Sequence, residues 1–122
     1  MQLDLVTVGR ISVDLFAEQI NTSFSQPQTF HKSIGGSPTN VAVAAAKLGH
    51  NAAIVTKVGV DPLGQYVQNK LNEFGVKTDF VKVAESGLTP VVLASQDPPE
   101  DPKIIFHRQP HAPDTQLIVS DI

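Results

Sequence analysis

The strongest constraint on the fold is a helix signature that occurs twice. Each copy begins with a residue that can cap a helix, continues with a proline and closes with a glycine. The two copies are Ser37 and Pro38 with Gly49, and Asp61 and Pro62 with Gly75. Proline suits the first helical turn, where its missing N–H has no partner to lose, and glycine readily adopts the left-handed conformation that ends a helix. We predict helices over 38–48 and 62–74, with Ser37 and Asp61 as N-caps. For Asp61 this role is favoured over that of a catalytic carboxylate.

Short apolar, β-branched runs alternate with these helices. They cover residues 3–8, 53–58 and 80–83. Such runs are typical of buried strands in a parallel sheet. The order strand, helix, strand, helix, strand predicts an α/β fold with a parallel sheet and right-handed crossovers.

A second group of strand-like segments is more polar. It comprises residues 11–18, 28–34, 89–95 and 103–108. The connector 96–102 holds three prolines, which exclude a helix and favour an exposed loop, so the last two segments are predicted to form a hairpin. Together the four segments could build a small sheet separate from the parallel one.

Composition argues against several classes of function. The 122 residues carry a net charge of −3 and no run of Lys or Arg, which argues against a nucleic-acid surface. No apolar stretch is long enough to cross a bilayer, no signal peptide is evident, and cysteine is absent. The four histidines are scattered without ligand spacing. We expect a cytoplasmic protein that binds neither nucleic acid, membrane nor metal through these residues.

Residues 35–40, with the sequence Gly-Gly-Ser-Pro-Thr-Asn, are the best candidate for a ligand site. Two glycines ahead of a helix let the backbone approach a ligand closely, and the N–H groups of the first turn favour oxygen-rich or anionic groups. Asn40 offers both donors and acceptors to sugar hydroxyls. The alternative is a plain loop-to-helix turn. The G-x-G-x-x-G fingerprint and the G-K-[ST] of a phosphate loop are absent, so a mononucleotide site is not supported.

Residues 35–59 resemble the first signature of the ribokinase (PfkB) family of carbohydrate kinases. The matching positions are Gly35, Gly36, Pro38, Asn40, Ala42, Gly49 and Gly59, extended by residues 58–61 with Gly64 and by Gly9 with Asp14. The resemblance covers essentially the whole chain. It implies a ribokinase-like α/β fold with a small β lid, formed by about 11–34 and 89–109.

The resemblance also implies a set of substrate-binding residues. Asp14 would accept hydrogen bonds from sugar hydroxyls, although the residue by itself could equally belong to a turn or a cap. Gly35, Gly36 and Asn40 would line the same pocket, with Ser12 at its margin.

Within the family, residues 9–15 and 35–38 are most similar to kinases of keto-deoxy sugar acids, which serve inositol catabolism. Residues 104–108 resemble the lid strand of such kinases, in which an aromatic residue and an arginine lie two positions apart. In a strand, Phe106 and Arg108 would face the same side, and Arg108 could pair with a substrate carboxylate through two hydrogen bonds. The alternatives are a solvated Arg108, a kinase of a neutral sugar of the fructokinase or ribokinase type, a non-catalytic sugar-binding module, and a nucleotide-binding Rossmann domain.

The resemblance places the catalytic machinery elsewhere. In this family the base lies in a late Gly-Ala-Gly-Asp segment and the ATP-binding strands are C-terminal; neither occurs in these 122 residues. We therefore expect an N-terminal portion of a ribokinase-like domain, a fragment with no catalytic residue and no bound cofactor, inactive alone. The full-length protein would use ATP and Mg²⁺ on a sugar or sugar acid. Exposed lid strands could also form a homodimer.

Overall fold

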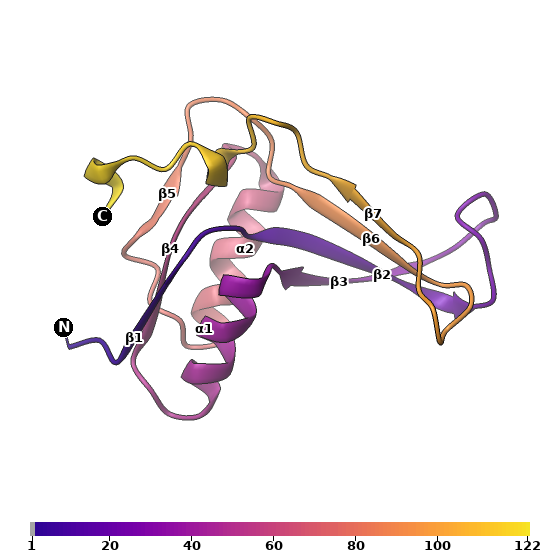
Figure 1. Ribbon diagram of the computed structural model, residues 1–122, viewed down its shortest axis with the longest axis horizontal. Coiled ribbons are helices and arrows are strands. Elements are labelled where there is room, and N and C mark those ends of the chain that lie inside the picture. Colours follow the sequence, from indigo (N-terminus) through magenta and orange to yellow (C-terminus); the bar gives the residue numbers. More distant parts are fainter. Residues whose placement is uncertain (1) are drawn as a thin grey trace.

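The computed structural model describes residues 2–122 and consists of two sheets, two helices and two short 3₁₀ turns (Figure 1). The elements are, in chain order, β1 (Leu5–Val8), β2 (Ser12–Ile20), β3 (Phe30–Gly35), α1 (Ser37–Lys47), β4 (Ala52–Val58), α2 (Pro62–Glu73), β5 (Val81–Val83), β6 (Val91–Gln96), β7 (Ile104–His107), η1 (Pro113–Thr115) and η2 (Val119–Asp121).

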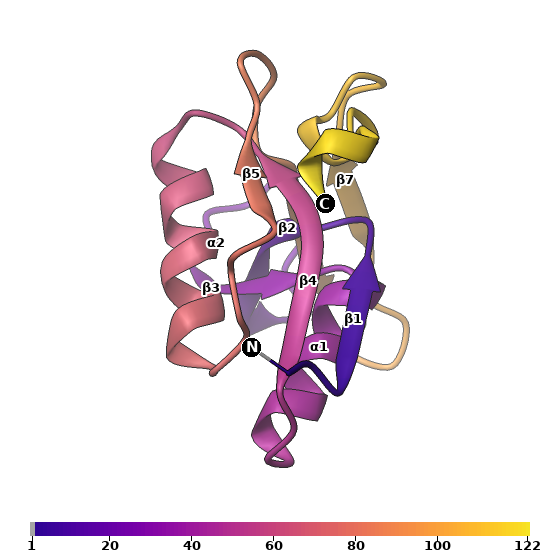
Figure 2. The same cartoon turned by 90° about the vertical axis from the view of Figure 1, so that its left-hand side faces the viewer.

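The first sheet is parallel and has the strand order β1-β4-β5. Its middle strand, β4, is buried along almost its whole length. Helices α1 and α2 lie on the same side of this sheet, as Figures 1 and 2 show from two directions. On β1, by contrast, Val6 and Val8 remain exposed. The predicted alternation of strands and helices around a parallel sheet is confirmed.

The hydrophobic core lies between β4 and the two helices. Ile54 and Val58 of β4 meet Ala42 of α1 and Val67 and Leu71 of α2, and all five side chains are fully buried. Burial of this apolar surface is the main stabilising contribution to the fold. The small side chain of Ala42 lets α1 lie close to the sheet.

The second sheet has the strand order β3-β2-β6-β7 and extends away from the helices (Figure 1). β2 and β3 are antiparallel, and β6 and β7 form the predicted antiparallel hairpin. The two antiparallel pairs meet where β2 runs parallel to β6, with Val13 opposite Val91 and Asp14 opposite Val92. The predicted small sheet is confirmed, and all four strands fall within the two segments expected to form a lid.

The two helix starts differ from each other. Asp61 caps α2 as predicted, because its side chain accepts a hydrogen bond from the Gly64 N–H at 2.7 Å. The prediction of Ser37 as the cap of α1 is wrong. The first helical hydrogen bond runs from the Asn40 N–H to the Gly36 carbonyl, so Gly36 occupies the cap position and Ser37 is already inside the helix.

Candidate functional site

A cavity of about 520 Å³ lies between the first turns of α1 and one face of the second sheet. A volume of this size suits a small-molecule ligand. Its walls are formed by Arg10, Ser12, Asp14, Phe16, Gly36, Ser37, Asn40, Val41, Ala44, Val92, Ala94, Ile104 and Phe106. The polar lining residues come from β2, α1 and the segment after β1, whereas β6 and β7 contribute only apolar residues.

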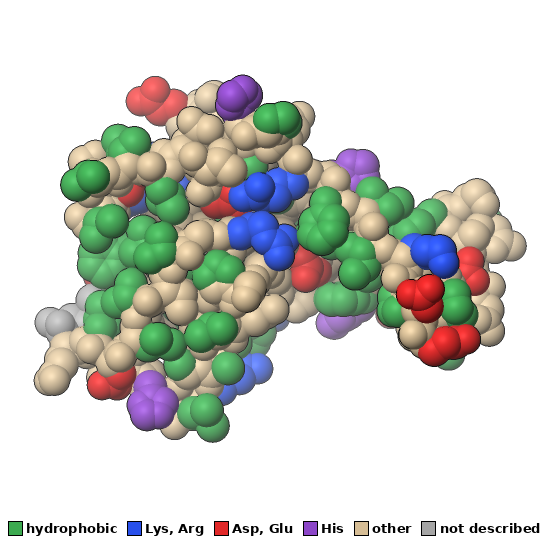
Figure 3. Space-filling model, in the orientation of Figure 1, with side chains coloured by type: hydrophobic (Ala, Val, Ile, Leu, Met, Phe, Trp, Pro, Cys, Tyr) green, Lys and Arg blue, Asp and Glu red, His purple; other side chains and the backbone are tan. Residues whose placement is uncertain are grey.

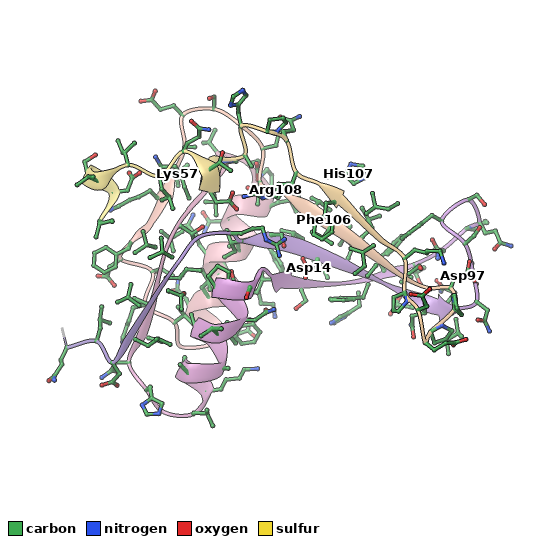
Figure 4. The ribbon with its side chains drawn as sticks, viewed as in Figure 1. Asp14, Lys57, Asp97, Phe106, His107 and Arg108 are labelled. Atoms are coloured by element: carbon green, nitrogen blue, oxygen red, sulfur yellow. The ribbon has the colours of Figure 1, made fainter. Side chains whose placement is uncertain are left out.

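Strand β2 contributes polar residues to the cavity because its side chains alternate between two faces of the sheet. Ser12, Asp14 and Phe16 share the face that borders the cavity, while Val13 between them points into the core. The Ser12 hydroxyl donates to Asp14 Oδ1 at 2.7 Å and fixes the orientation of the carboxylate. Figure 4 shows Asp14 on the same side of the sheet as Phe106 of β7.

Burial raises the pKa of Asp14 above its ordinary value, although the hydrogen bond from Ser12 and the positive charge of Arg10 act in the opposite direction. Partial desolvation makes the carboxylate a stronger hydrogen-bond acceptor, because less water competes for its oxygens. Asp14 is thus prepared to accept hydrogen bonds from hydroxyl groups of a ligand.

Gly35 provides the space that the Asp14 side chain occupies. A β-carbon at position 35 would lie 1.9 Å from Asp14 Oδ2. Gly35 therefore belongs to the site without lining the cavity itself, since any side chain there would displace the carboxylate.

Gly36 brings the start of α1 against the segment that follows β1. Its φ of +106° lies in the region that favours glycine, and a β-carbon would lie 2.5 Å from the Arg10 carbonyl oxygen. The same carbonyl accepts a hydrogen bond from the Thr39 hydroxyl at 3.1 Å. These contacts leave Asn40 at the cavity wall, with its backbone N–H used by the helix and its side chain available.

The structure brings together most of the residues that the sequence analysis proposed. Those lining the cavity are Ser12, Asp14, Gly36, Asn40 and Phe106. Their roles in substrate binding remain predictions, as does that of Gly35.

Arg108 lies outside this group. β7 ends at His107, and the guanidinium of Arg108 is paired with the Asp114 carboxylate rather than turned into the cavity. The other oxygen of Asp114 accepts the Ile11 N–H at 3.0 Å. Arg108 borders a different hollow, and the expectation that it contacts a substrate carboxylate stays a prediction.

Among the cavity residues that the sequence analysis missed, Arg10 is the charged one. It lies at the cavity wall, and its guanidinium carbon is 5.6 Å from the centre of the Phe106 ring. In the view of Figure 3, basic side chains lie beside hydrophobic surface near the middle of the molecule. The signal was available, because ligands of parallel α/β sheets tend to bind beyond the carboxyl ends of strands, and Arg10 is the second residue after β1.

Asp61 is fully engaged in a structural network. Besides capping α2, it accepts the Thr89 N–H at 2.9 Å and the Thr89 hydroxyl at 2.9 Å. Burial opposes ionisation of this side chain, but the hydrogen bonds from the backbone of Thr89 and Gly64 and from the Thr89 hydroxyl prevail and lower its pKa below the ordinary value. This supports the structural role predicted for Asp61.

Residues 2–122 contain no cluster of three His, Asp or Glu side chains that could hold a metal ion. Among the same residues, neither helix is long and apolar enough to cross a membrane.

Comparison with known proteins identifies the family. The sequence profile of the pfkB family carbohydrate kinases matches residues 2–119. The chain belongs to the pfkB family of carbohydrate kinases. A relative from Clostridium beijerinckii, named 5-dehydro-2-deoxygluconokinase, is 35% identical over 125 residues, covering 99% of this chain and 36% of the relative. The 5-dehydro-2-deoxygluconokinase 1 of Bacillus cereus is 34% identical over 106 residues, 86% of this chain and 32% of the relative. The chain thus spans about a third of the length of these pfkB relatives.

Solved structures show the same fold. A PfkB protein from Polaromonas superposes with a TM-score of 0.88 at 26% identity, over 99% of this chain and 40% of that one. A fructokinase from Xylella fastidiosa superposes with a TM-score of 0.82 at 27% identity, over 97% of this chain and 37% of that one. The fold of this pfkB chain is therefore ribokinase-like, as predicted.

Proposed function

We propose that this chain forms the substrate-binding part of an ATP-dependent kinase that phosphorylates a keto-deoxy sugar acid, 5-dehydro-2-deoxygluconate or a close analogue. The observation that carries the proposal is Asp14, a partly desolvated carboxylate oriented by Ser12 at a cavity of about 520 Å³. The names of the relatives from Clostridium beijerinckii and Bacillus cereus support the substrate class. A role in inositol catabolism is part of the proposal.

Each wall of the cavity has a task in this proposal. Asp14 accepts hydrogen bonds from sugar hydroxyls, and the Asn40 amide donates to and accepts from their neighbours. Ile104 and Phe106 cover the carbon skeleton and exclude water. Fixing the sugar in this way orients the hydroxyl that is to be phosphorylated, and orientation accounts for much of the catalysis of phosphoryl transfer.

The phosphoryl donor is assigned to other parts of the full-length protein. Relatives of the fold have been solved with ATP, such as a sugar kinase of Pyrococcus horikoshii that superposes with a TM-score of 0.85. Residues 2–122 do not fit a binding site for ATP and Mg²⁺, because they include neither a glycine-rich phosphate loop nor a cluster of carboxylates for Mg²⁺. We expect the 122 residues alone to bind the sugar without transferring phosphate.

The second sheet is proposed to act as the lid of the site. It bears exposed apolar residues on its edge strand β7, among them Ile104 and Ile105. Exposed edge strands pair readily with other strands, so the same edge is a candidate homodimer contact in the cytoplasm.

A kinase of a neutral sugar is the second candidate. The observation in its favour is that Arg108, expected to bind the carboxylate, is paired with Asp114 outside the cavity. The structural similarity to the fructokinase of Xylella fastidiosa is consistent with this reading.

The test is a kinase assay on the full-length gene product with 5-dehydro-2-deoxygluconate, fructose and ribose as substrates. The acid should be preferred in kcat/KM, and Asp14→Asn should lower kcat/KM for it by about 10- to 100-fold, the cost of losing charged hydrogen bonds. Glu18→Gln is the matched control, because Glu18 lies on the same strand but outside the cavity.

Two outcomes would contradict the proposal. A preference for fructose or ribose would favour the neutral-sugar kinase. Calorimetric binding of a sugar without any phosphorylation by the full-length product would favour a non-catalytic sugar-binding module.

A further inference from the structure

We propose that Arg10 binds the carboxylate of the substrate, and that Arg108 acts as a positioning residue that holds the Arg10 segment in place through Asp114. The inference rests on the proposed function, since it assumes an acidic sugar. It assigns the recognition of that acid to a residue other than the one expected from the sequence.

Among residues 2–122, Arg10 is the one cation at the wall of the cavity, and Asp14 is the one anion. The side chain of Arg10 forms no ion pair with any of residues 2–122. It lies against the Phe106 ring at 5.6 Å, within the range of a cation–π contact. With no carboxylate paired to it, the guanidinium can offer two parallel in-plane N–H groups to a ligand carboxylate.

Arg10 and Asp14 are near each other but not paired. The positive charge of Arg10 acts to lower the pKa of the Asp14 carboxylate, yet the two side chains form no ion pair with a nitrogen-to-oxygen distance of 4.0 Å or less. A polyol that carries a carboxylate complements this arrangement, with its hydroxyls at Asp14 and its charge at Arg10. A neutral sugar would leave the Arg10 donors without an anionic partner.

The backbone of Arg10 is fixed from two directions. On one side, the Thr39 hydroxyl donates to the Arg10 carbonyl at 3.1 Å, and Gly36 packs against the same oxygen. On the other, the next backbone N–H, that of Ile11, donates to Asp114 Oδ2 at 3.0 Å. A binding residue that is already held in place loses less freedom when the ligand arrives.

Arg108 completes this support. Asp114 is only 6% exposed, and a buried carboxylate is costly unless it is paired. Arg108 supplies the countercharge through its ion pair with Oδ1. Its influence on the cavity therefore passes through Asp114 and Ile11, and no direct contact with the substrate is needed.

The experiment compares selectivity in the full-length gene product. The substrates are 5-dehydro-2-deoxygluconate and the analogue in which the carboxylate is reduced to a primary alcohol. For Arg10→Gln, the ratio of kcat/KM for the acid to that for the alcohol should fall about 100-fold, the size of a lost charged two-pronged contact. Arg10→Lys should give an intermediate fall in this ratio, because lysine keeps the positive charge but cannot donate the two parallel hydrogen bonds of a guanidinium. Lys103→Gln, which removes an exposed cation outside the cavity, should leave the ratio unchanged.

Arg108→Gln and Arg108→Lys separate positioning from contact. Arg108→Gln should lower both the thermal midpoint and the affinity for the acid, since it leaves the buried Asp114 carboxylate without its ion-pair partner. Arg108→Lys can still pair with Asp114 and should retain most of the thermal stability and most of the affinity for the acid, as measured by thermal unfolding and by calorimetric titration with the acid.

The inference is overturned if the enzyme prefers the acid and Arg10→Gln keeps that preference, or if Arg108→Lys loses the preference while its thermal midpoint is unchanged. A wild-type enzyme that does not prefer the acid overturns the proposed function, and the inference falls with it.

Discussion

The starts of the two helices show how the same local sequence can be put to different use. Both α1 and α2 begin with a proline in the first turn. At α2 the Asp61 carboxylate satisfies the Gly64 N–H and two groups of Thr89, so the helix end is closed by the protein itself. At α1 the cap position is Gly36, whose lack of a side chain leaves the first turn beside the cavity without a capping hydrogen bond.

Under the proposed function, this difference shows where the chain gives up local stability for binding. A side-chain cap stabilises a helix by about a few tenths of a kcal/mol more than a glycine cap, and α1 lacks that contribution because its cap is Gly36. In exchange, polar groups of its first turn remain available to a ligand. The two helix starts therefore separate a position that serves the fold from one that serves the site, and substitutions should separate them too.

The largest effect is expected at Gly36. Gly36→Ala forces a β-carbon to 2.5 Å from the Arg10 carbonyl at a φ of +106°, and backbone strain plus overpacking should lower the free energy of unfolding by about 3 kcal/mol. Gly49→Ala is the matched control, because Gly49 also has a positive φ, +91°, but no atom within 4 Å of a β-carbon; it should cost about 1 kcal/mol. Urea denaturation measures both, and equal losses would show that the contact with Arg10 carries no weight.

The next effect is expected at the closed helix start. Asp61→Ala removes the cap and two hydrogen bonds to Thr89, which should lower the free energy of unfolding by about 2 kcal/mol near neutral pH. The folded state lowers the pKa of Asp61, so its stabilisation is present above the ordinary value of 3.8 and is lost as the pH falls through the depressed pKa.

Denaturation of wild type and Asp61→Ala at several pH values checks that sign. The two curves should converge as the medium becomes more acidic than pH 3.8, while substrate affinity at neutral pH stays within about twofold of wild type. A loss of sugar binding without loss of stability would instead assign Asp61 to the site.

The smallest effect, of opposite sign, is expected at Asp14. Because burial raises its pKa, ionised Asp14 destabilises the folded state above that pKa, and the destabilisation disappears as the pH falls through it. Asp14→Asn keeps an oxygen for the Ser12 hydroxyl and should raise the free energy of unfolding slightly at neutral pH, by less than about 1 kcal/mol, which thermal unfolding would show as a small rise in the midpoint. A lower midpoint than wild type at neutral pH would mean that Asp14 stabilises the fold.

Much of this fold was predictable because its signals are local. The prolines at 38 and 62 and the glycines at 49 and 75 mark both helices to within one residue, and the Asp61 cap follows from residue type and position. The cap of α1 was not predictable in the same way. Ser37 is a good capping residue by type, but the close approach of Gly36 to Arg10 moves the helix start back by one position.

The rest of the site depends on contacts between distant segments. The pairing of β2 with β6, which joins Val13 to Val91, gives no signal in either strand alone. For the same reason the sequence did not reveal that Arg108 would meet Asp114 or that Arg10 would lie over Phe106. The family resemblance pointed to Asp14 and the glycine motif to Asn40 as candidate site residues, but only the tertiary structure brings Arg10 to the cavity.

The alternation along β2 has a further consequence for how such a site can change. Ser12, Asp14 and Phe16 line the cavity, whereas Val13 and Ala17 are buried on the opposite face. Single replacements on the cavity face can therefore alter what is bound while the core stays intact. Insertion or deletion of one residue would exchange the two faces and abolish both together. Divergence of specificity in this strand should proceed by substitution at fixed length.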